Sequence, residues 1–209
     1  MPSTLVHLAI GGIIAVGLLG RAYGLRALFI VLVFTAIPDI DTFLGLLIAG
    51  GHRAILHNLL LPGIIAGVLV YDTRIRPISY LRKRFTPKSI RIVWVGLIAM
   101  VLGGIGPDLV TNGVNIFYPI HDQFYKINGK LVISNQQGII QTFIEFSKAG
   151  GETAVGSTQE VHYGTGVDPT KGKEPKNIER IFPIVRSGMQ LLILVSSVIL
   201  NSIRLWEDR

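Results

Sequence analysis

Apolar residues dominate five stretches of the chain, at roughly 4–20, 27–49, 54–71, 92–107 and 183–203. A helix needs about 20 apolar residues to cross the hydrocarbon core of a bilayer, within a range of about 17–25. The third and fifth stretches fit this length, and the first and fourth fit its short end. The second is long enough only if Pro38, Asp39 and Asp41 lie inside it. The pattern therefore predicts about five transmembrane helices.

The composition supports an integral membrane protein. The chain has 209 residues, of which 49% are hydrophobic and only 16% charged, and its mean hydropathy is +0.52. An ordinary soluble domain carries more charge than this. The sequence contains no cysteine, so disulfides and thiolate metal sites are excluded, and any metal must take nitrogen and oxygen ligands.

The positions of lysine and arginine predict the orientation. Arg21 and Arg26 flank the link between the first two stretches, and Arg204 and Arg209 follow the last one. Seven further basic residues join the third and fourth stretches: Arg74, Arg76, Arg82, Lys83, Arg84, Lys88 and Arg91. Basic loops remain on the cytoplasmic side, so we expect the N-terminus outside and the C-terminus inside. Because Arg21 follows the first stretch rather than preceding it, we expect a retained span and not a cleaved signal.

The basic loop has a sufficient explanation in this topology. Clustered basic charge attracts anionic lipid or nucleic acid, but the net charge of +7 is concentrated in a loop whose orienting role accounts for it. We therefore expect membrane lipids as partners and no nucleic acid, and the sequence leaves protein partners open. A multi-pass protein of the cell membrane is the expected localisation.

The segment between the fourth and fifth spans has a different pattern. Residues 124–127, then Asn128-Gly129, then residues 130–134 are typical of a β-hairpin, because Asn-Gly suits a type I′ turn. Residues 150–175 are rich in Gly, Thr, Pro and charge, as in a loop. We expect a four-span bundle at 1–111, a β-containing extracytoplasmic cap with a flexible arm at 112–180, and a final helix with a cytoplasmic tail at 181–209. The fold class is thus all-α membrane protein with a small β insertion.

Ionisable residues interrupt the apolar stretches at four places, all toward the outer face in this topology: His7, Asp39 with Asp41, His52 with His57, and Asp108. An ionisable side chain at bilayer depth is costly, so it usually faces a cavity and serves a function. Histidine and aspartate together form a ligand set that divalent metals use. The pattern therefore predicts a metal site, with zinc as the first expectation.

Several of these residues also have ordinary structural explanations. Pro38 disfavours helical geometry just before it, so Asp41 would either cap a following helix or hold a ligand histidine while Asp39 binds metal. The two histidines would either be ligands or lie at the interface, and Gly50-Gly51 suggests a helix start that puts Arg53 and His57 on one face. Asp108, at the negative end of a helix, needs a cation nearby, either a metal or a lysine of the cap.

The motifs resemble the YdjM-like family of inner-membrane, metal-dependent hydrolases. The matching segments are the early His7, Ile37-Pro-Asp-Ile-Asp41, His52-Arg-Ala-Ile-Leu-His-Asn-Leu59 and Asp108-Leu-Val-Thr-Asn-Gly-Val114, followed by Pro119. They cover about residues 1–120. This family is thought to be distantly related to zinc-dependent phospholipase C and to P1-type nucleases. The resemblance implies His7, Asp39, His52, His57 and Asp108 as metal ligands, with Arg53 near a phosphate.

The chain departs from the family pattern at one informative position. Family members often carry a histidine four residues before the last aspartate, and Gly104 stands there in this sequence. Three alternatives follow: His121 replaces that ligand, the site holds a single metal, or it holds none. We expect a metal-dependent hydrolase acting on a phosphodiester or another ester of a lipid-like substrate at the outer leaflet, with Asp41 and Arg53 as catalytic residues. The alternative is a non-catalytic, metal-binding membrane scaffold.

Overall fold

The computed structural model describes residues 3–44, 51–127, 129, 131–136, 138–141, 154–159 and 184–207. Its helical elements are α1 (Thr4–Leu19), η1 (Gly20–Ala22), α2 (Leu25–Ala36), η2 (Pro38–Ile40), α3 (Asp41–Leu44), α4 (Leu60–Val70), η3 (Tyr71–Ile75), α5 (Tyr80–Arg84), α6 (Pro87–Ala99), η4 (Met100–Ile105), α7 (Gly106–Thr111) and α8 (Gly188–Glu207). The strands are β1 (Phe124–Tyr125), β2 (Leu131–Ser134), β3 (Gly138–Gln141) and β4 (Ala154–Gly156).

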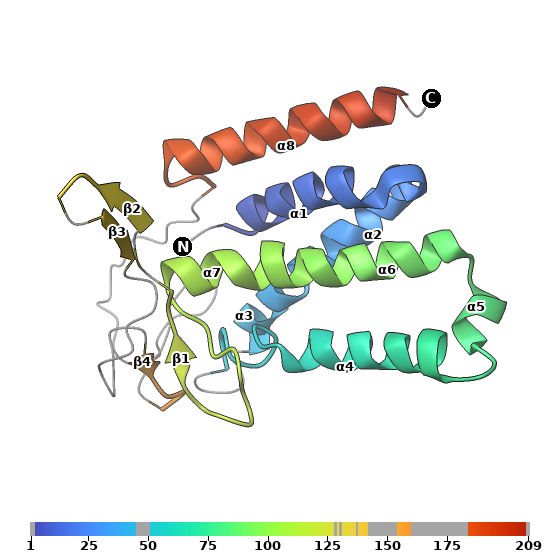
Figure 1. Ribbon diagram of the computed structural model, residues 1–209, viewed down its shortest axis with the longest axis horizontal. Helices are drawn as coiled ribbons and strands as arrows, with labels where there is room; N and C mark the ends of the chain where they lie inside the picture. The colour runs from blue at the N-terminus through green and yellow to red at the C-terminus, as the bar shows by residue number, and fades with distance from the viewer. Residues whose placement is uncertain are drawn as a thin grey trace.

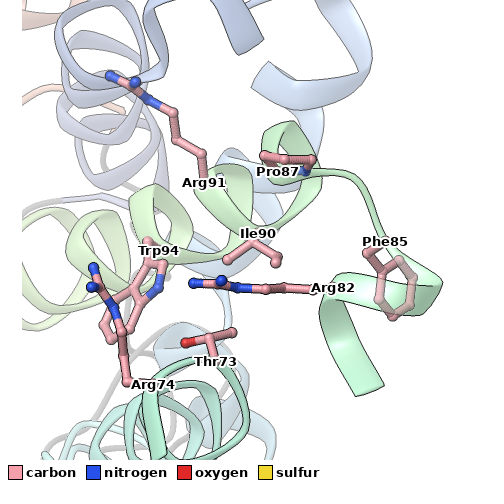
Figure 2. Close-up of a pocket in the computed structure, with 8 residues that line it drawn as sticks. All are labelled: Thr73, Arg74, Arg82, Phe85, Pro87, Ile90, Arg91 and Trp94. Atoms are coloured by element: carbon pink, nitrogen blue, oxygen red, sulfur yellow. The ribbon is translucent and has the colours of Figure 1, made fainter. Parts of the chain in front are cut away.

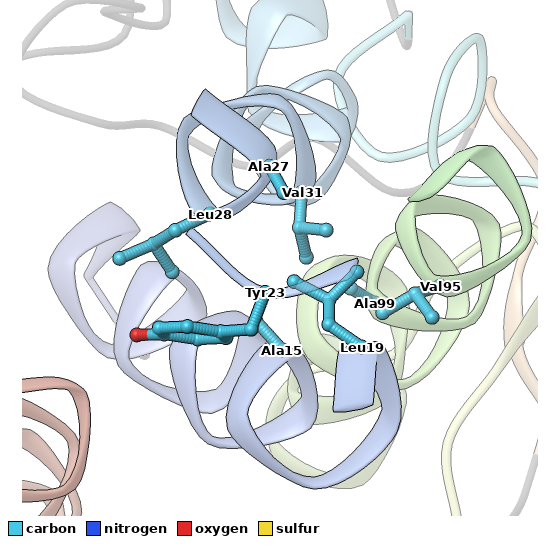
Figure 3. Packing of buried hydrophobic residues seen from close by; sticks show 8 residues of the cluster. All are labelled: Ala15, Leu19, Tyr23, Ala27, Leu28, Val31, Val95 and Ala99. Carbon is cyan, nitrogen blue, oxygen red and sulfur yellow. The ribbon is translucent and has the colours of Figure 1, made fainter. Parts of the chain in front are cut away.

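Helix α1 lies at the centre of the bundle. It packs against α2, α6 and α8, and α6 and α7 form one long rod beside it (Figure 1). Small and branched side chains fill the space between α1, α2 and α6 (Figure 3), and the buried members of this core are Ala15, Leu19, Tyr23, Ala27, Leu28, Val31, Val95 and Ala99. Much of this core lies in segments long and apolar enough to cross a membrane, where close van der Waals packing of side chains, rather than their removal from water, holds helices together.

Three helical segments are long and apolar enough to cross a membrane: Thr4–Ala22, Pro87–Thr111 and Gly188–Glu207. The bent pair Leu25–Ala36 and Pro38–Leu44 makes a fourth if it is one broken span. The expected third span corresponds to α4, with 11 residues, followed by the 5 residues of η3. The mostly helical membrane fold is therefore confirmed in part, while the fifth span and the orientation stay predictions.

The break expected at Pro38 is present, and its form is a bend. Helix α2 ends at Ala36, and a 3₁₀ turn follows at Pro38–Ile40. Ile37 keeps helical dihedrals (φ −53°, ψ −45°), so the chain bends by 46° and does not become extended. Proline favours such a break because it lacks an N–H and crowds the preceding turn. The bend turns Asp39 and Asp41 away from the direction of α2.

The helix expected to start near Gly50-Gly51 begins later than predicted. Residues 52–59 form turns and bends, and α4 starts at Leu60. Arg53 and His57 therefore do not share a helix face, and that prediction was wrong. Arg53 has a positive φ of 63°, which no continuous α-helix accommodates. The segment is nevertheless buried, because His57 and Ala54 have almost no exposed surface.

The predicted hairpin has a different pairing. Strand β2 pairs with β3 in an antiparallel ladder running from Leu131↔Gln141 to Ser134↔Gly138. Strand β1 pairs instead with β4, far along the chain. The positions of β1 and β2 were thus anticipated, but among the described residues these two strands do not pair with each other. Asn128 and Lys130 of the expected turn lie outside the described residues. Gly138, with a φ of +71°, begins β3 in a conformation that glycine adopts without strain.

Candidate metal centre

Four ionisable side chains from four different elements converge at one end of the bundle. His7 comes from α1, Asp39 from η2, Asp108 from α7, and His57 from the segment before α4. The Nε2 atom of His7 lies 4.0 Å from Asp39 Oδ1 and 3.6 Å from Asp108 Oδ2. The Nε2 atom of His57 lies 3.8 Å and 3.2 Å from the same two oxygens. Both rings therefore present the same nitrogen to the same pair of carboxylates.

The other nitrogen of each ring fixes its tautomer. His7 Nδ1 lies 2.7 Å from the carbonyl oxygen of Gly103, which accepts and never donates, so Nδ1 carries the proton. His57 Nδ1 lies 2.8 Å from Asp41 Oδ2 and donates in the same way. In the neutral rings both Nε2 atoms then carry a lone pair. Metal-binding histidines are commonly held like this, by a carbonyl or a carboxylate at the far nitrogen.

Two lone pairs facing two carboxylates repel one another unless a cation is present. His7, His57 and Asp108 are each 3% exposed or less, so water screens this repulsion poorly. The buried Oδ2 of Asp39 has no hydrogen-bond partner among the described residues. The guanidinium of Arg53, whose Nη2 lies 3.4 Å from Asp108 Oδ1, offsets part of this charge, and either protons on the imidazoles or a single metal ion would balance the rest. Oxygen and nitrogen donors in this number suit zinc and similar divalent ions, so the residues fit a metal.

A group of three donor residues, His7, Asp39 and Asp108, meets the spacing that a metal ion needs, with their ligand atoms within 4.8 Å of one another. His57 adds a fourth donor atom, its Nε2, at the distances given above. Asp39 is the most accessible member, since 20% of its side chain is exposed. Any small molecule that reaches the centre would approach along the Asp39 side.

Asp41 holds the segment that carries His57. Its Oδ2 accepts the His57 Nδ1 proton and also the backbone N–H of Arg53 at 2.9 Å, and the residue has no exposed surface. The carboxylate thus contacts the back of the histidine ring. These are the contacts of a positioning residue, and a catalytic role for Asp41 stays a prediction.

Arg53 is held in a conformation that is unfavourable for a side chain larger than glycine. Its φ is 63°, in the left-handed region that costs a non-glycine residue about 1 kcal/mol or more. Its N–H is bound by Asp41 and its carbonyl accepts the N–H of Asn115 at 3.0 Å. The Nη2 atom lies 3.4 Å from Asp108 Oδ1. The strained backbone therefore directs a buried guanidinium at one of the converging carboxylates.

Close helix packing brings the four side chains together. A Cβ added to Gly104 would lie 2.7 Å from the backbone oxygen of Thr35 and 3.0 Å from Pro38 Cγ, and one added to Gly103 would lie 3.2 Å from Gly11 N. The π-helical turn η4 thus fits directly against α1 and the end of α2. A histidine in place of Gly104 would not fit here without a shift of the backbone.

Residues of the loop after α7 support Arg53 from the other side. Asp122 accepts a hydrogen bond from Asn115 Nδ2 at 2.6 Å and two from Thr158, through its N–H at 3.1 Å and its hydroxyl at 2.6 Å. Desolvation acts to raise the pKa of Asp122, but the hydrogen bonds from Thr158 and Asn115 outweigh it and hold the pKa below its usual value. No local motif in the sequence indicated this link between 115, 122 and 158.

The roles expected for two further histidines stay predictions. His52 is buried, at 5% exposed. His121 is exposed and lies beside the ring of Tyr125, with centroids 6.1 Å apart. His162, in the arm at 150–175, lies outside the described residues.

Comparison with known families gives one match. The model of the YdjM inner membrane protein family matches residues 1–163, which include all the residues of the converging cluster. Comparison with the curated proteins and with the solved structures gives no match. The matched region is well over half of the chain. The description of the family as an inner membrane protein agrees with the helical membrane fold. The chain belongs to the YdjM inner membrane protein family.

Proposed function

We propose that this protein is a membrane-bound, metal-dependent hydrolase that cleaves a phosphodiester or another ester of a lipid-like substrate at the outer leaflet. The convergence of the Nε2 atoms of His7 and His57 on Asp39 and Asp108 carries this proposal. His7, Asp39, His57 and Asp108 would hold the ion, with zinc as the first expectation. His52, the fifth predicted ligand, keeps that role only as a prediction.

A bound zinc ion lowers the pKa of a coordinated water to about 7 and polarises an ester or phosphoryl oxygen. The residues of the protein would hold the ligand side chains in position and exclude bulk water. Asp41 fixes the His57 ring through its Nδ1 atom, and Gly103 does the same for His7. Arg53, paired with Asp108 at 3.4 Å, would stabilise negative charge that develops on the substrate, because a guanidinium matches phosphate and carboxylate geometry.

The surroundings of the site favour a substrate with an apolar tail. Asp39, the most exposed of the four residues, is followed by Ile40, which is 50% exposed, and by Phe43, which is 59% exposed. Such side chains would lie in lipid or at its edge in a membrane protein. A substrate with an acyl chain would reach Asp39 from the bilayer, whereas a soluble polar substrate would have to leave water to do so.

Metal content tests the site first. The detergent-purified protein is measured by inductively coupled plasma mass spectrometry beside His57→Ala and the matched control His121→Ala, which removes an exposed histidine outside the cluster. We expect stoichiometric metal in the wild type and the control, and loss in His57→Ala. Turnover of a phospholipid by the metal-loaded protein is then assayed. Full activity in both Asp39→Ala and His57→Ala would overturn the hydrolase proposal.

A closed, structural metal site in a non-catalytic scaffold is the second candidate, and the burial of His7, His57 and Asp108 favours it. Structural metal sites have all their coordination positions filled by protein, whereas catalytic ones keep one for water. Water-proton relaxation of the Mn²⁺-loaded protein distinguishes the two. Enhancement above free Mn²⁺ indicates a coordinated, exchanging water and supports the hydrolase. Its absence, with Mn²⁺ bound stoichiometrically, supports the scaffold.

A further inference from the structure

A pocket lies at the opposite end of α4 and α6 from the metal centre. Its volume is about 580 Å³, and it is formed by η3, α5 and the first turns of α6. Arg74, Arg82 and Trp94 reach into it, and Phe85 and Ile90 add apolar walls (Figure 2). The basic loop is thus more than a run of solvated charge, because three of its arginines, Arg74, Arg82 and Arg91, line one cavity.

Arg74 and Arg82 are free to bind a ligand. Figure 2 shows the guanidinium groups of Arg74 and Arg82 extending toward the indole of Trp94 from two different elements. Neither guanidinium has a hydrogen-bond or ion-pair partner among the described residues. Arg91 differs, since its Nε donates to the carbonyl of Leu18 at 2.9 Å and its side chain points away from the other two. The pocket therefore has two guanidinium groups that are always charged and available to a ligand.

Local hydrogen bonds fix the position of Arg82. Asp72 is 7% exposed, and it accepts hydrogen bonds from the hydroxyl of Ser79 at 2.6 Å and from the N–H groups of Tyr80 and Leu81 at 3.0 and 2.9 Å. These bonds tie the start of α5 to η3. The walls of the pocket are consequently preorganised, which reduces the entropy lost on binding.

The segment that leads into the pocket carries side chains that suit a membrane interface. Phe85 lines the pocket; this residue and four others of the segment 71–85, Tyr71, Ile75, Ile78 and Tyr80, are each between 47% and 66% exposed. Aromatic and apolar side chains beside arginines are typical of the headgroup region of a bilayer, where one part of the side chain meets lipid and another meets water. Helix α6 also begins here, at Pro87, and its positive end favours an anion.

We propose that this pocket binds the phosphate group of an anionic phospholipid, with Arg74 and Arg82 as the charged ligands and Trp94 and Phe85 against the glycerol and upper acyl region. Planar guanidinium groups pair bidentately with phosphate. The apolar walls of the pocket and the exposed apolar side chains of residues 71–85 distinguish a lipid from a soluble phosphate ester. Nucleic acid is less suitable, since its backbone has no apolar counterpart to these side chains. This proposal does not depend on the metal centre.

Trp94 reports on the pocket directly. The chain has two tryptophans, so a Trp206→Phe background leaves Trp94 as the only one. The full-length protein in dodecyl maltoside micelles is titrated with phosphatidylglycerol, with phosphatidylcholine and with inorganic phosphate, at a fixed ionic strength near 0.15 M. The test variant is Arg74→Gln with Arg82→Gln. The matched control is Lys83→Gln with Arg84→Gln, which removes the same charge from neighbouring exposed positions outside the pocket.

We expect saturable binding of phosphatidylglycerol that weakens about tenfold in the pocket variant, equivalent to about 1.4 kcal/mol, and less than twofold in the control. Phosphatidylcholine should bind more weakly than phosphatidylglycerol. Equal weakening in both double variants would mean a diffuse charge effect and would overturn the site. Inorganic phosphate that displaces the lipid at millimolar concentration would overturn the lipid assignment. All four residues are exposed, so we expect every variant to fold. Thermal unfolding of each variant checks this.

Discussion

The two polar ends of this protein handle charge in opposite ways. At one end His7, His57, Asp39 and Asp108 are brought together from four elements and largely buried, each paired with another member of the group. At the other end, the arginines of the pocket are exposed and come from consecutive elements of one segment, residues 74–91. Figure 1 shows α4 and the α6–α7 rod running side by side between these ends.

The difference lies in what each arrangement costs. A buried charge must be compensated by partners in its own structure, since desolvation exceeds any attraction that a poor geometry provides. An exposed charge keeps its hydration and remains available for a ligand that arrives later. The buried end therefore suits one small cation held by fixed donors, and the exposed end suits a larger anionic partner.

The largest expected effect is the loss of a buried partner. Asp108→Ala removes the carboxylate that pairs with Arg53, His7 and His57, so one ion-pair partner of a buried guanidinium is lost. We expect a cost of about 3–5 kcal/mol in the free energy of unfolding together with loss of bound metal. The control Glu207→Ala breaks the exposed pair with Arg204 at 3.2 Å and should cost about 0.5 kcal/mol or less. Thermal unfolding in detergent measures both, and equal shifts would contradict the contrast.

Close packing at the metal end gives the next effect. Gly104→Ala places a methyl group against the Thr35 carbonyl and Pro38, and overpacking of this kind costs about 1–3 kcal/mol. Gly67→Ala is the matched change in α4, where nothing lies within 4 Å of the added atom. That substitution should be neutral or stabilising, because alanine favours helix over glycine by about 1 kcal/mol. Metal content should fall in Gly104→Ala only. A Gly104→Ala variant that keeps its stability and its metal would show that η4 is not packed tightly against α2.

Backbone strain at Arg53 is expected to have a smaller effect. Both Arg53→Ala and Arg53→Gly remove the guanidinium, but only glycine relieves the φ of 63°. We expect the free energy of unfolding of the alanine variant to be about 1 kcal/mol lower than that of the glycine variant. Equilibrium unfolding of the two proteins measures the difference directly. Equal stabilities would mean that residue 53 changes its backbone conformation once the side chain is removed.

The sequence predicted the residues of the metal end better than their arrangement. Hydropathy located His7, Asp39, His57 and Asp108 because each interrupts an apolar stretch, and the second role suggested for Asp41, holding a histidine, agrees with its contact to His57 Nδ1. Position along a helix was not a guide for Arg53 and His57, because tertiary hydrogen bonds to Asp41 and Asn115 hold that segment out of a helix. A helical period has no information about partners so far apart in sequence.

The strand pairing shows the same limit. The apolar residues of β2 were recognised, but its partner is β3, while β1 pairs with the distant β4. The turn signal at Asn128-Gly129 is local, whereas the link from Asp122 to Thr158 is set by tertiary contacts. By contrast, the basic pocket arises almost wholly from one segment, so its charge was evident in the sequence, and only its shape required the structure.

The smallest effect concerns how Asp72 holds the basic pocket. The hydrogen bond from Ser79 holds the pKa of Asp72 below its ordinary value, and burial opposes it, while the N–H groups of Leu81 and Tyr80 and the charge of Arg76 act in the same direction as Ser79. Because the folded pKa is lower than the unfolded one, the contribution is complete above the unfolded pKa of about 3.9 and is lost as the pH falls through the folded value. The pocket should therefore be unchanged between pH 8 and 5.

Trp94 fluorescence in the Trp206→Phe background checks this sign. Wild-type protein should show a constant spectrum down to about pH 4, and a change below it as Asp72 is protonated and α5 separates from η3. Asp72→Asn should already have the altered spectrum at pH 6 and lack the acid transition. Asp122→Asn removes a carboxylate whose pKa is also lowered but which belongs to the loop beside Arg53, so it should leave the Trp94 titration intact. An acid transition that persists in Asp72→Asn would show that another group loosens the pocket, and that the exposed end is less firmly built than its hydrogen bonds indicate.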